Sequence, residues 1–151
     1  MKKLILILSL AFVAISCGAS KGVVNTDNKG FIADGYDVTE YFEGNAQEGN
    51  NAYTSTYNGA SYKFMNAANK AMFDKNPSQY EPQYGGFCAY AVGDSNSKIG
   101  INPESFIVED GKLYLFYDTV FSDTKEKWLN ENPEKLEQQA DTNWKTLKNK
   151  N

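Results

Sequence analysis

Cys88 is the residue of this sequence with the clearest capacity for chemistry, and it lies in QYGGFCAYAV, residues 83–92. A thiol in this setting can act as a nucleophile, a metal ligand or a small core residue. A nucleophilic cysteine needs its thiolate stabilised by a cation, a base or a helix N-terminus. No lysine lies between Lys75 and Lys98, so only a helix that begins near Gly86 could supply that stabilisation. We therefore expect Cys88 to be a buried structural thiol rather than a reactive one.

The residue types that are missing restrict the chemistry further. The sequence contains no histidine, and all 15 of its basic residues are lysines. The usual general base, the commonest transition-metal ligand and the bidentate phosphate clamp are therefore absent. Glu109 and Asp110 are adjacent acids that could form a catalytic pair, but a turn at Asp110-Gly111 explains them better. We expect no catalytic residue, and we expect that the protein is not an enzyme.

One segment has the outline of a calcium-binding loop. Residues 94–105, DSNSKIGINPES, begin with Asp94 and Asn96 as an EF-hand loop does. Lys98 occupies a position that needs an oxygen ligand, and Ile99 occupies the position of the turn glycine. The pattern indicates an ordinary loop, and we expect no metal ligand in it.

The amino-terminal residues are typical of a bacterial lipoprotein signal. Two lysines precede an apolar run, Leu4 to Ile15, which is too short to span a bilayer and suits the hydrophobic region of a signal peptide. AISC then resembles a lipobox, in which the cysteine is diacylated and becomes the first residue. We predict a signal peptide over 1–16, acylation of Cys17 and a lipidated tether over 17–30. The alternative is an ordinary secretory signal with an incidental cysteine.

Charge restricts the partners of the mature protein. The formal charge is −4, and loss of Lys2 and Lys3 leaves 13 lysines against 19 acids, or −6. Such a surface repels phosphate backbones, so we expect no nucleic-acid partner. Charge alone would also not hold the domain on anionic lipid. We expect the lipid bilayer to be a partner through acylated Cys17, with the domain outside the cytoplasm in the bacterial cell envelope.

The remaining sequence, residues 31–148, predicts one α+β domain without internal repeats. Tyr53, Ser55 and Tyr57 alternate before Asn58-Gly59, a strong signal for a type I′ turn in a hairpin. A second hairpin is predicted in SFIVEDGKLYLFYD, with its turn at Asp110-Gly111. We expect a small antiparallel sheet from these two hairpins, packed with helices.

Helices are predicted after each hairpin. The first is NAANKAMFDKN, with Asn66 as its N-cap and Pro77 as its end. Two helices close the chain: one carries Phe121 and Trp128, and the other begins at Asn132-Pro133. The face of that last helix is expected to pack in the core through Leu136, Ala140, Trp144 and Leu147.

The segment YKFMNAANKAMFDKNPSQYEPQYGGFCAYAV resembles the YHS-domain family, and GYDVTEYF, GKLYLFYD and ADTNW resemble its secreted branch. The resemblance covers nearly all of residues 31–147. It implies a small α+β domain, and it implies metal binding where cysteines occupy three positions of the family pattern. In this chain Glu40, Met65 and Asn69 occupy those positions. With at most one thiolate and no imidazole left, we expect no metal site and no cofactor.

These observations favour a non-catalytic, membrane-anchored envelope lipoprotein with a YHS-like domain that binds a small ligand or a partner protein. The candidate ligand-binding residues are Tyr36, Asp37, Tyr84 and Cys88. Tyrosines near the glycine turns can line a groove, or they can belong to the core and its rim. The alternative functions are weak binding of a soft metal such as Cu(I) through methionine and cysteine, or a redox or thiol function of Cys88.

Overall fold

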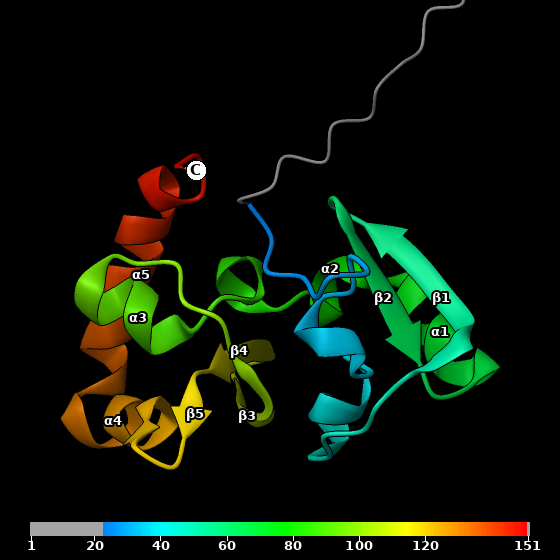
Figure 1. The fold of residues 1–151 in the computed structure, drawn as a ribbon, viewed down its shortest axis with the longest axis horizontal. Helices are drawn as coiled ribbons and strands as arrows, with labels where there is room; N and C mark the ends of the chain where they lie inside the picture. Colours follow the sequence, from blue (N-terminus) through cyan, green and yellow to red (C-terminus); the bar gives the residue numbers. More distant parts are fainter. Residues whose placement is uncertain (1–22, 151) are drawn as a thin grey trace, which may run out of the picture.

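Two β-hairpins organise the computed structural model, which describes residues 23–150 (Figure 1). Strand β1 (Asn50–Tyr57) pairs antiparallel with β2 (Ala60–Phe64), and β3 (Asn102–Glu109) pairs antiparallel with β4 (Lys112–Phe116). Both residues of each turn have positive φ, 47° and 81° at Asn58-Gly59 and 50° and 73° at Asp110-Gly111. This is the type I′ geometry that matches the twist of paired strands. Both predicted hairpins and both turns are confirmed.

The predicted α+β class is confirmed, but the hairpins do not share a sheet. Each forms its own two-stranded sheet, and a third pair in the described chain joins β5 (Asp118–Thr119) to β6 (Ser122–Asp123). Helix α1 (Ala67–Lys75) begins where the Asn66 side chain accepts a hydrogen bond from the Asn69 N–H at 2.8 Å, as its N-cap prediction requires. Pro77 then starts a short helix, α2 (Pro77–Tyr80).

Helices α4 (Thr124–Glu131) and α5 (Pro133–Leu147) close the chain. The side chains of Asp123 and Asn132 cap them, accepting from the N–H groups of Glu126 at 2.9 Å and Lys135 at 3.1 Å. Trp128 is buried in α4 as expected. The assignment of Phe121 to this helix is wrong, because Phe121 lies in the β5–β6 turn and is 95 % exposed.

A short helix that the sequence did not predict follows Cys88. Helix α3 (Ala89–Ser95) packs on α5, where a Cβ on Gly93 would come within 2.7 Å of the Leu136 carbonyl oxygen. Three 3₁₀ turns complete the described elements: η1 (Ala33–Gly35), η2 (Glu40–Glu43) and η3 (Gln83–Gly86).

Strand β4 separates two hydrophobic cores. Leu113 and Leu115 belong to a core with β2, α1 and α2, whereas Tyr114 and Phe116 belong to a core with α3, α4 and α5. Side chains alternate across a strand, so one strand can serve both cores. Figure 1 shows these two parts of the molecule on either side of the β3–β4 hairpin.

The two hairpins also share their local geometry, although their sequences show no obvious repeat. In each, the first strand begins with an asparagine, Asn50 or Asn102, whose side chain accepts from the N–H two residues later. Each ends at a buried phenylalanine, Phe64 or Phe116, after the same register shift. The first hairpin is followed by α1, the Asn76-Pro77 pair and α2, and the second is followed, after the β5–β6 pair, by α4, the Asn132-Pro133 pair and α5. The two hairpins therefore share a local order of elements.

Residues 23–30, which we expected to belong to the tether, pack on the domain instead. The Asn25 N–H donates to the Gly85 carbonyl oxygen at 2.8 Å, and the Asn25 side chain donates to that of Gly86 at 3.1 Å. Asp27 closes a turn by accepting from the N–H groups of Lys29 and Phe31. The predicted signal peptide, Cys17 and the first part of the tether lie outside the described residues.

Candidate functional site: a groove around Trp144

A groove crosses the surface where four segments distant in sequence meet. One cavity of about 530 Å³ is lined by residues of α2, η3 and α5, and a second of about 510 Å³ is lined by the amino-terminal segment and the β1–β2 turn. The two cavities share Glu81, Gly85 and Trp144, so we treat them as one site and call it the Trp144 groove. Its other lining residues are Val23, Val24, Asn58, Gly59, Ser78, Pro82, Gln83, Tyr84, Asp141 and Lys145.

The floor of the Trp144 groove depends on an unusual backbone at η3. Tyr84, Gly85 and Gly86 follow one another with φ of 54°, 60° and 78°. A Cβ on Gly85 would come within 2.2 Å of the Val23 carbonyl oxygen and 3.1 Å of the Trp144 ring. Glycine alone combines this positive φ with so close an approach. The glycine therefore lets the amino-terminal segment and α5 meet over η3.

One face of α5 supplies the far wall. Asp141, Trp144 and Lys145 are three and four residues apart, which places them together on a helix. Trp144 is half-buried, with its ring centroid 6.2 Å from that of Tyr84 and 6.1 Å from that of Phe87. Asp141 and Lys145 are exposed. The wall thus presents an indole ring between an anion and a cation.

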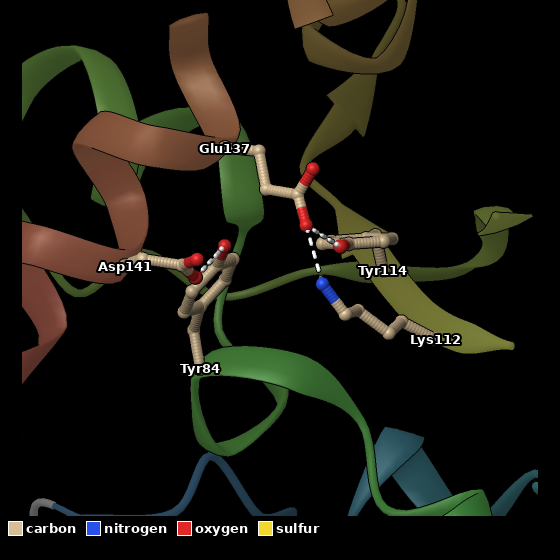
Figure 2. A network of polar contacts seen from close by, with 5 residues as sticks. All are labelled: Tyr84, Lys112, Tyr114, Glu137 and Asp141. Atoms are coloured by element: carbon tan, nitrogen blue, oxygen red, sulfur yellow. Dashed lines mark hydrogen bonds and ion pairs between the residues drawn. The ribbon is translucent and has the colours of Figure 1, made fainter. Parts of the chain in front are cut away.

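Hydrogen bonds fix this face of α5 against η3 and β4 (Figure 2). The Tyr84 hydroxyl donates to an Asp141 carboxylate oxygen at 2.9 Å. One turn earlier, a single carboxylate oxygen of Glu137 accepts from the Lys112 ammonium and from the Tyr114 hydroxyl, each at 2.7 Å. The groove wall is therefore held by two carboxylates on α5 that reach two different elements.

The same contacts shift the ionisation of these groups. The Lys112 ammonium, followed by the Tyr114 hydroxyl, lowers the pKa of Glu137 by stabilising its carboxylate. Burial raises the pKa of Tyr84 well above its ordinary value, and the neighbouring Asp141 carboxylate raises it further. Tyr84 is therefore a neutral hydrogen-bond donor at physiological pH.

The predicted ligand-binding residues do not gather at one site. Tyr84 alone lines the Trp144 groove. Tyr36 lies beside β3, where its hydroxyl approaches a Glu104 carboxylate oxygen at 3.4 Å. Asp37 is fully buried, and its two carboxylate oxygens accept from groups of the domain itself. A ligand in the groove would contact Tyr84 without contacting Asp37 or Cys88.

The three positions highlighted by the YHS resemblance do come together, around Asp37. The Asn69 side-chain amide donates to Asp37 and to Glu40, both at 2.8 Å, and the Met65 N–H donates to Asp37 at 2.8 Å. The amide thus bridges two carboxylates and ties α1 to the η1–η2 segment, while Asp37 also holds Met65, the residue that follows β2. Within residues 23–150 no cluster of three or more histidine, cysteine, aspartate or glutamate side chains could hold a metal ion.

Cys88 is fully buried, as expected, and it performs a similar connecting role in the second half. Its sulfur lies 3.3 Å from the Thr124 hydroxyl oxygen, and that hydroxyl donates to the Tyr117 carbonyl oxygen at 2.6 Å. Cys88 is the N-cap residue of α3, but its side chain makes no capping hydrogen bond. Met65, which stands at one of the metal-ligand positions of the YHS pattern, does not lie near Cys88, because it lies beside Asp37 in the other half of the molecule.

Sequence reasoning missed most of the groove. The sequence predicts Trp144 in the core-facing stripe of α5, and no motif in it marks Asp141, Lys145 or Glu81 as part of a site. The one available signal is the spacing that places Asp141, Trp144 and Lys145 on one helix face. The contribution of Val23 and of the β1–β2 turn had no local signal, because it depends on tertiary contacts.

No family model matches the chain, and no curated protein or solved structure matches it either. The resemblance to the YHS-domain family therefore stays a prediction from the residues quoted above. Among residues 23–150, no helix combines the length and the apolar character needed to cross a membrane.

Proposed function

We propose that this protein is a non-catalytic binding protein of the bacterial cell envelope, anchored by acyl chains on Cys17, and that the Trp144 groove holds a small ligand. The size of the groove carries the proposal: each of its two cavities, of about 530 and 510 Å³, lies within the range of small-molecule sites. The indole of Trp144 offers an apolar surface, and Asp141, Lys145 and Glu81 offer charges of both signs. A small molecule with both polar and apolar parts fits this lining.

The absence of catalytic residue types supports binding rather than catalysis. The sequence has no histidine and no arginine, and the Cys88 thiol is enclosed by the domain. Within the groove, Tyr84 is a neutral donor already bound to Asp141. These groups can orient a ligand, but they do not form a nucleophile with a general base.

The anchor rests on the AISC sequence that ends at Cys17. Two or three acyl chains would hold a small domain at a membrane almost irreversibly, because each buried methylene contributes about 0.8 kcal/mol. The intact mass of the protein purified from bacterial membranes tests this part. A mass that begins at an acylated Cys17 is expected, whereas a free Cys17 thiol or a retained Met1 would contradict it.

Native mass spectrometry of the same preparation tests the groove. We expect the wild-type protein to carry a small molecule that Trp144→Ala loses, because the indole is shared by both cavities. Trp144→Phe is the conservative variant and should retain part of the binding. Phe121→Ala, an equally drastic change at the 95 % exposed β5–β6 turn, serves as the control and should retain all of it.

The identified compound is then titrated against the purified wild type while tryptophan fluorescence is recorded, and its binding to Trp144→Ala is measured by calorimetry, because that variant lacks the reporting indole. A saturable fluorescence change in the wild type and no heat of binding in Trp144→Ala are expected. Equal retention of the compound by the wild type and by Trp144→Ala would exclude the groove as its site. If no compound is retained, and amino acids, monosaccharides and nucleosides all leave the fluorescence unchanged, the binding proposal is wrong.

A further inference from the structure

Lysines gather at one end of the molecule, although the protein as a whole is acidic. Residues 142–150 contain Lys145, Lys148 and Lys150 and no acid. Lys98 joins them, because its ammonium donates to the carbonyl oxygens of Lys148 and Lys150. We call these four residues the lysine end. The carboxylates closest to it in the groove, Asp141 and Glu81, accept hydrogen bonds from Tyr84 and Asn58.

Apolar side chains accompany the lysine end. The Lys98 ammonium lies 5.7 Å from the centroid of the Phe87 ring, and Phe87 in turn contacts Trp144. Phe87 and Trp144 are half-buried, and Ile99 is 41 % exposed. Lysines around partly exposed aromatic and aliphatic side chains are the composition of surfaces that rest on lipid headgroups.

The chain enters the domain at this same end. Val23, the first described residue, lines the groove together with Trp144. Figure 1 shows the start of the described chain and the carboxyl terminus on one side of the molecule, and β5 on the opposite side. Five residues lie between Cys17 and Val23, so even a fully extended chain spans only about 20 Å from one to the other. An acylated Cys17 would therefore keep the lysine end close to the bilayer.

We propose that the lysine end is a membrane-docking face that rests on anionic phospholipid. This inference rests on the anchor in the proposed function but not on the ligand of the groove. The acyl chains supply attachment, and the lysines set orientation, since each lysine near an anionic surface adds an attraction, whereas acids outnumber lysines in the rest of the domain. In this orientation the groove opens beside the bilayer, and the exposed Val120 and Phe121 face away from it.

Site-directed labelling of the acylated protein in vesicles tests the orientation. Cys17 is consumed by acylation and Cys88 is buried, so a cysteine introduced by Asn149→Cys is the thiol that reacts. An environment-sensitive fluorophore at this position should shift its emission to the blue in phosphatidylglycerol vesicles relative to phosphatidylcholine vesicles. The same fluorophore on Val120→Cys, at the opposite side, should show no shift.

Charge variants then separate docking from attachment. Lys145→Gln, Lys148→Gln and Lys150→Gln together should abolish the shift. The matched triple variant Lys125→Gln, Lys127→Gln and Lys135→Gln has the same net charge and should preserve it. A shift that survives the first triple change, or the same emission in phosphatidylglycerol and phosphatidylcholine vesicles, would overturn the proposal, while acylation shown by mass would still stand.

Failure of the anchor is distinguishable from failure of the docking face. If the mass shows an unacylated Cys17, the protein is sedimented with phosphatidylglycerol vesicles at low ionic strength. The Lys145, Lys148 and Lys150 triple change should then lower the partition coefficient on the order of a hundredfold, at about 1 kcal/mol for each lysine. Partitioning that is unchanged by this substitution would overturn the docking face independently of the anchor.

Discussion

Replacing Gly85 by alanine tests the argument that η3 is held by the amino-terminal segment. The new Cβ would lie 2.2 Å from the Val23 carbonyl oxygen, a backbone atom, and 3.1 Å from the Trp144 ring. The substitution also places a non-glycine residue at φ of 60°. The first effect displaces residues 23–25, and the second costs about 1 to 2 kcal/mol wherever it occurs.

The size of the loss follows from the contacts that the displacement breaks. The Asn25 N–H and the Asn25 side-chain amide donate to Gly85 and Gly86, and each such hydrogen bond contributes about 1 kcal/mol. Together with the backbone strain, Gly85→Ala should lower the free energy of unfolding by about 3 to 4 kcal/mol. Urea unfolding, followed by tryptophan fluorescence, measures this value.

Gly59→Ala is the matched control. Gly59 has φ of 81°, and no atom lies within 4 Å of its added Cβ. It should therefore lose only the strain of about 1 to 2 kcal/mol. The reasoning is refuted if the two variants lose the same free energy, because the collision with Val23 would then contribute nothing.

Three further variants test the contacts of the second core. Cys88→Ala should lower the free energy of unfolding by about 1 to 2 kcal/mol through the cavity it leaves. Cys88→Ser should lower it less, since serine is a favoured N-cap and the Thr124 hydroxyl is near. Thiol labelling of the wild-type Cys88 that is as fast without denaturant as with it would contradict the burial of this residue. The hydrogen bonds from Lys112 and Tyr114 lower the pKa of Glu137. The stability that Glu137 contributes is therefore fully present above its ordinary pKa of 4.5 and is lost as the pH falls through its lowered pKa. Glu137→Gln should therefore reduce the free energy of unfolding at neutral pH and flatten its decline at pH values below 4.5. Urea unfolding at neutral and acid pH measures both effects, with the exposed Glu134→Gln as the control. A pH dependence unchanged from that of the wild type would refute the role given to Glu137.

Local signals predicted the elements of the fold correctly where the physical cause is local. Asn58-Gly59 and Asp110-Gly111 specify type I′ turns because their residues tolerate positive φ. Asn66 and Asn132 specify helix starts because their side chains satisfy free N–H groups. Phe121 was misassigned because an aromatic residue near a helix suggests a core position, whereas the N-cap lies two residues later at Asp123.

The groove was beyond such reasoning for a physical reason. Its lining comes from the amino-terminal segment, the β1–β2 turn, η3 and α5, so no window of sequence contains it. The Gly85-Gly86 pair indicates a sharp turn, but the atom that requires glycine at position 85 belongs to Val23. Composition had suggested that residues 23–30 were tether, since small polar residues resemble a linker until their hydrogen-bond partners are known.

The position of β4 makes the two halves of the molecule mutually dependent. A shift of one residue in its pairing with β3 would carry Leu113 and Leu115 into the core with α3, α4 and α5, and would carry Tyr114 and Phe116 into the core with β2, α1 and α2. Both cores would then hold side chains of the wrong shape at once. The two-residue turn that prevents this shift therefore specifies packing on both sides of the strand. Because β4 contributes side chains to both cores, loss of either core also disrupts the other. The two halves are therefore coupled into one cooperative unit.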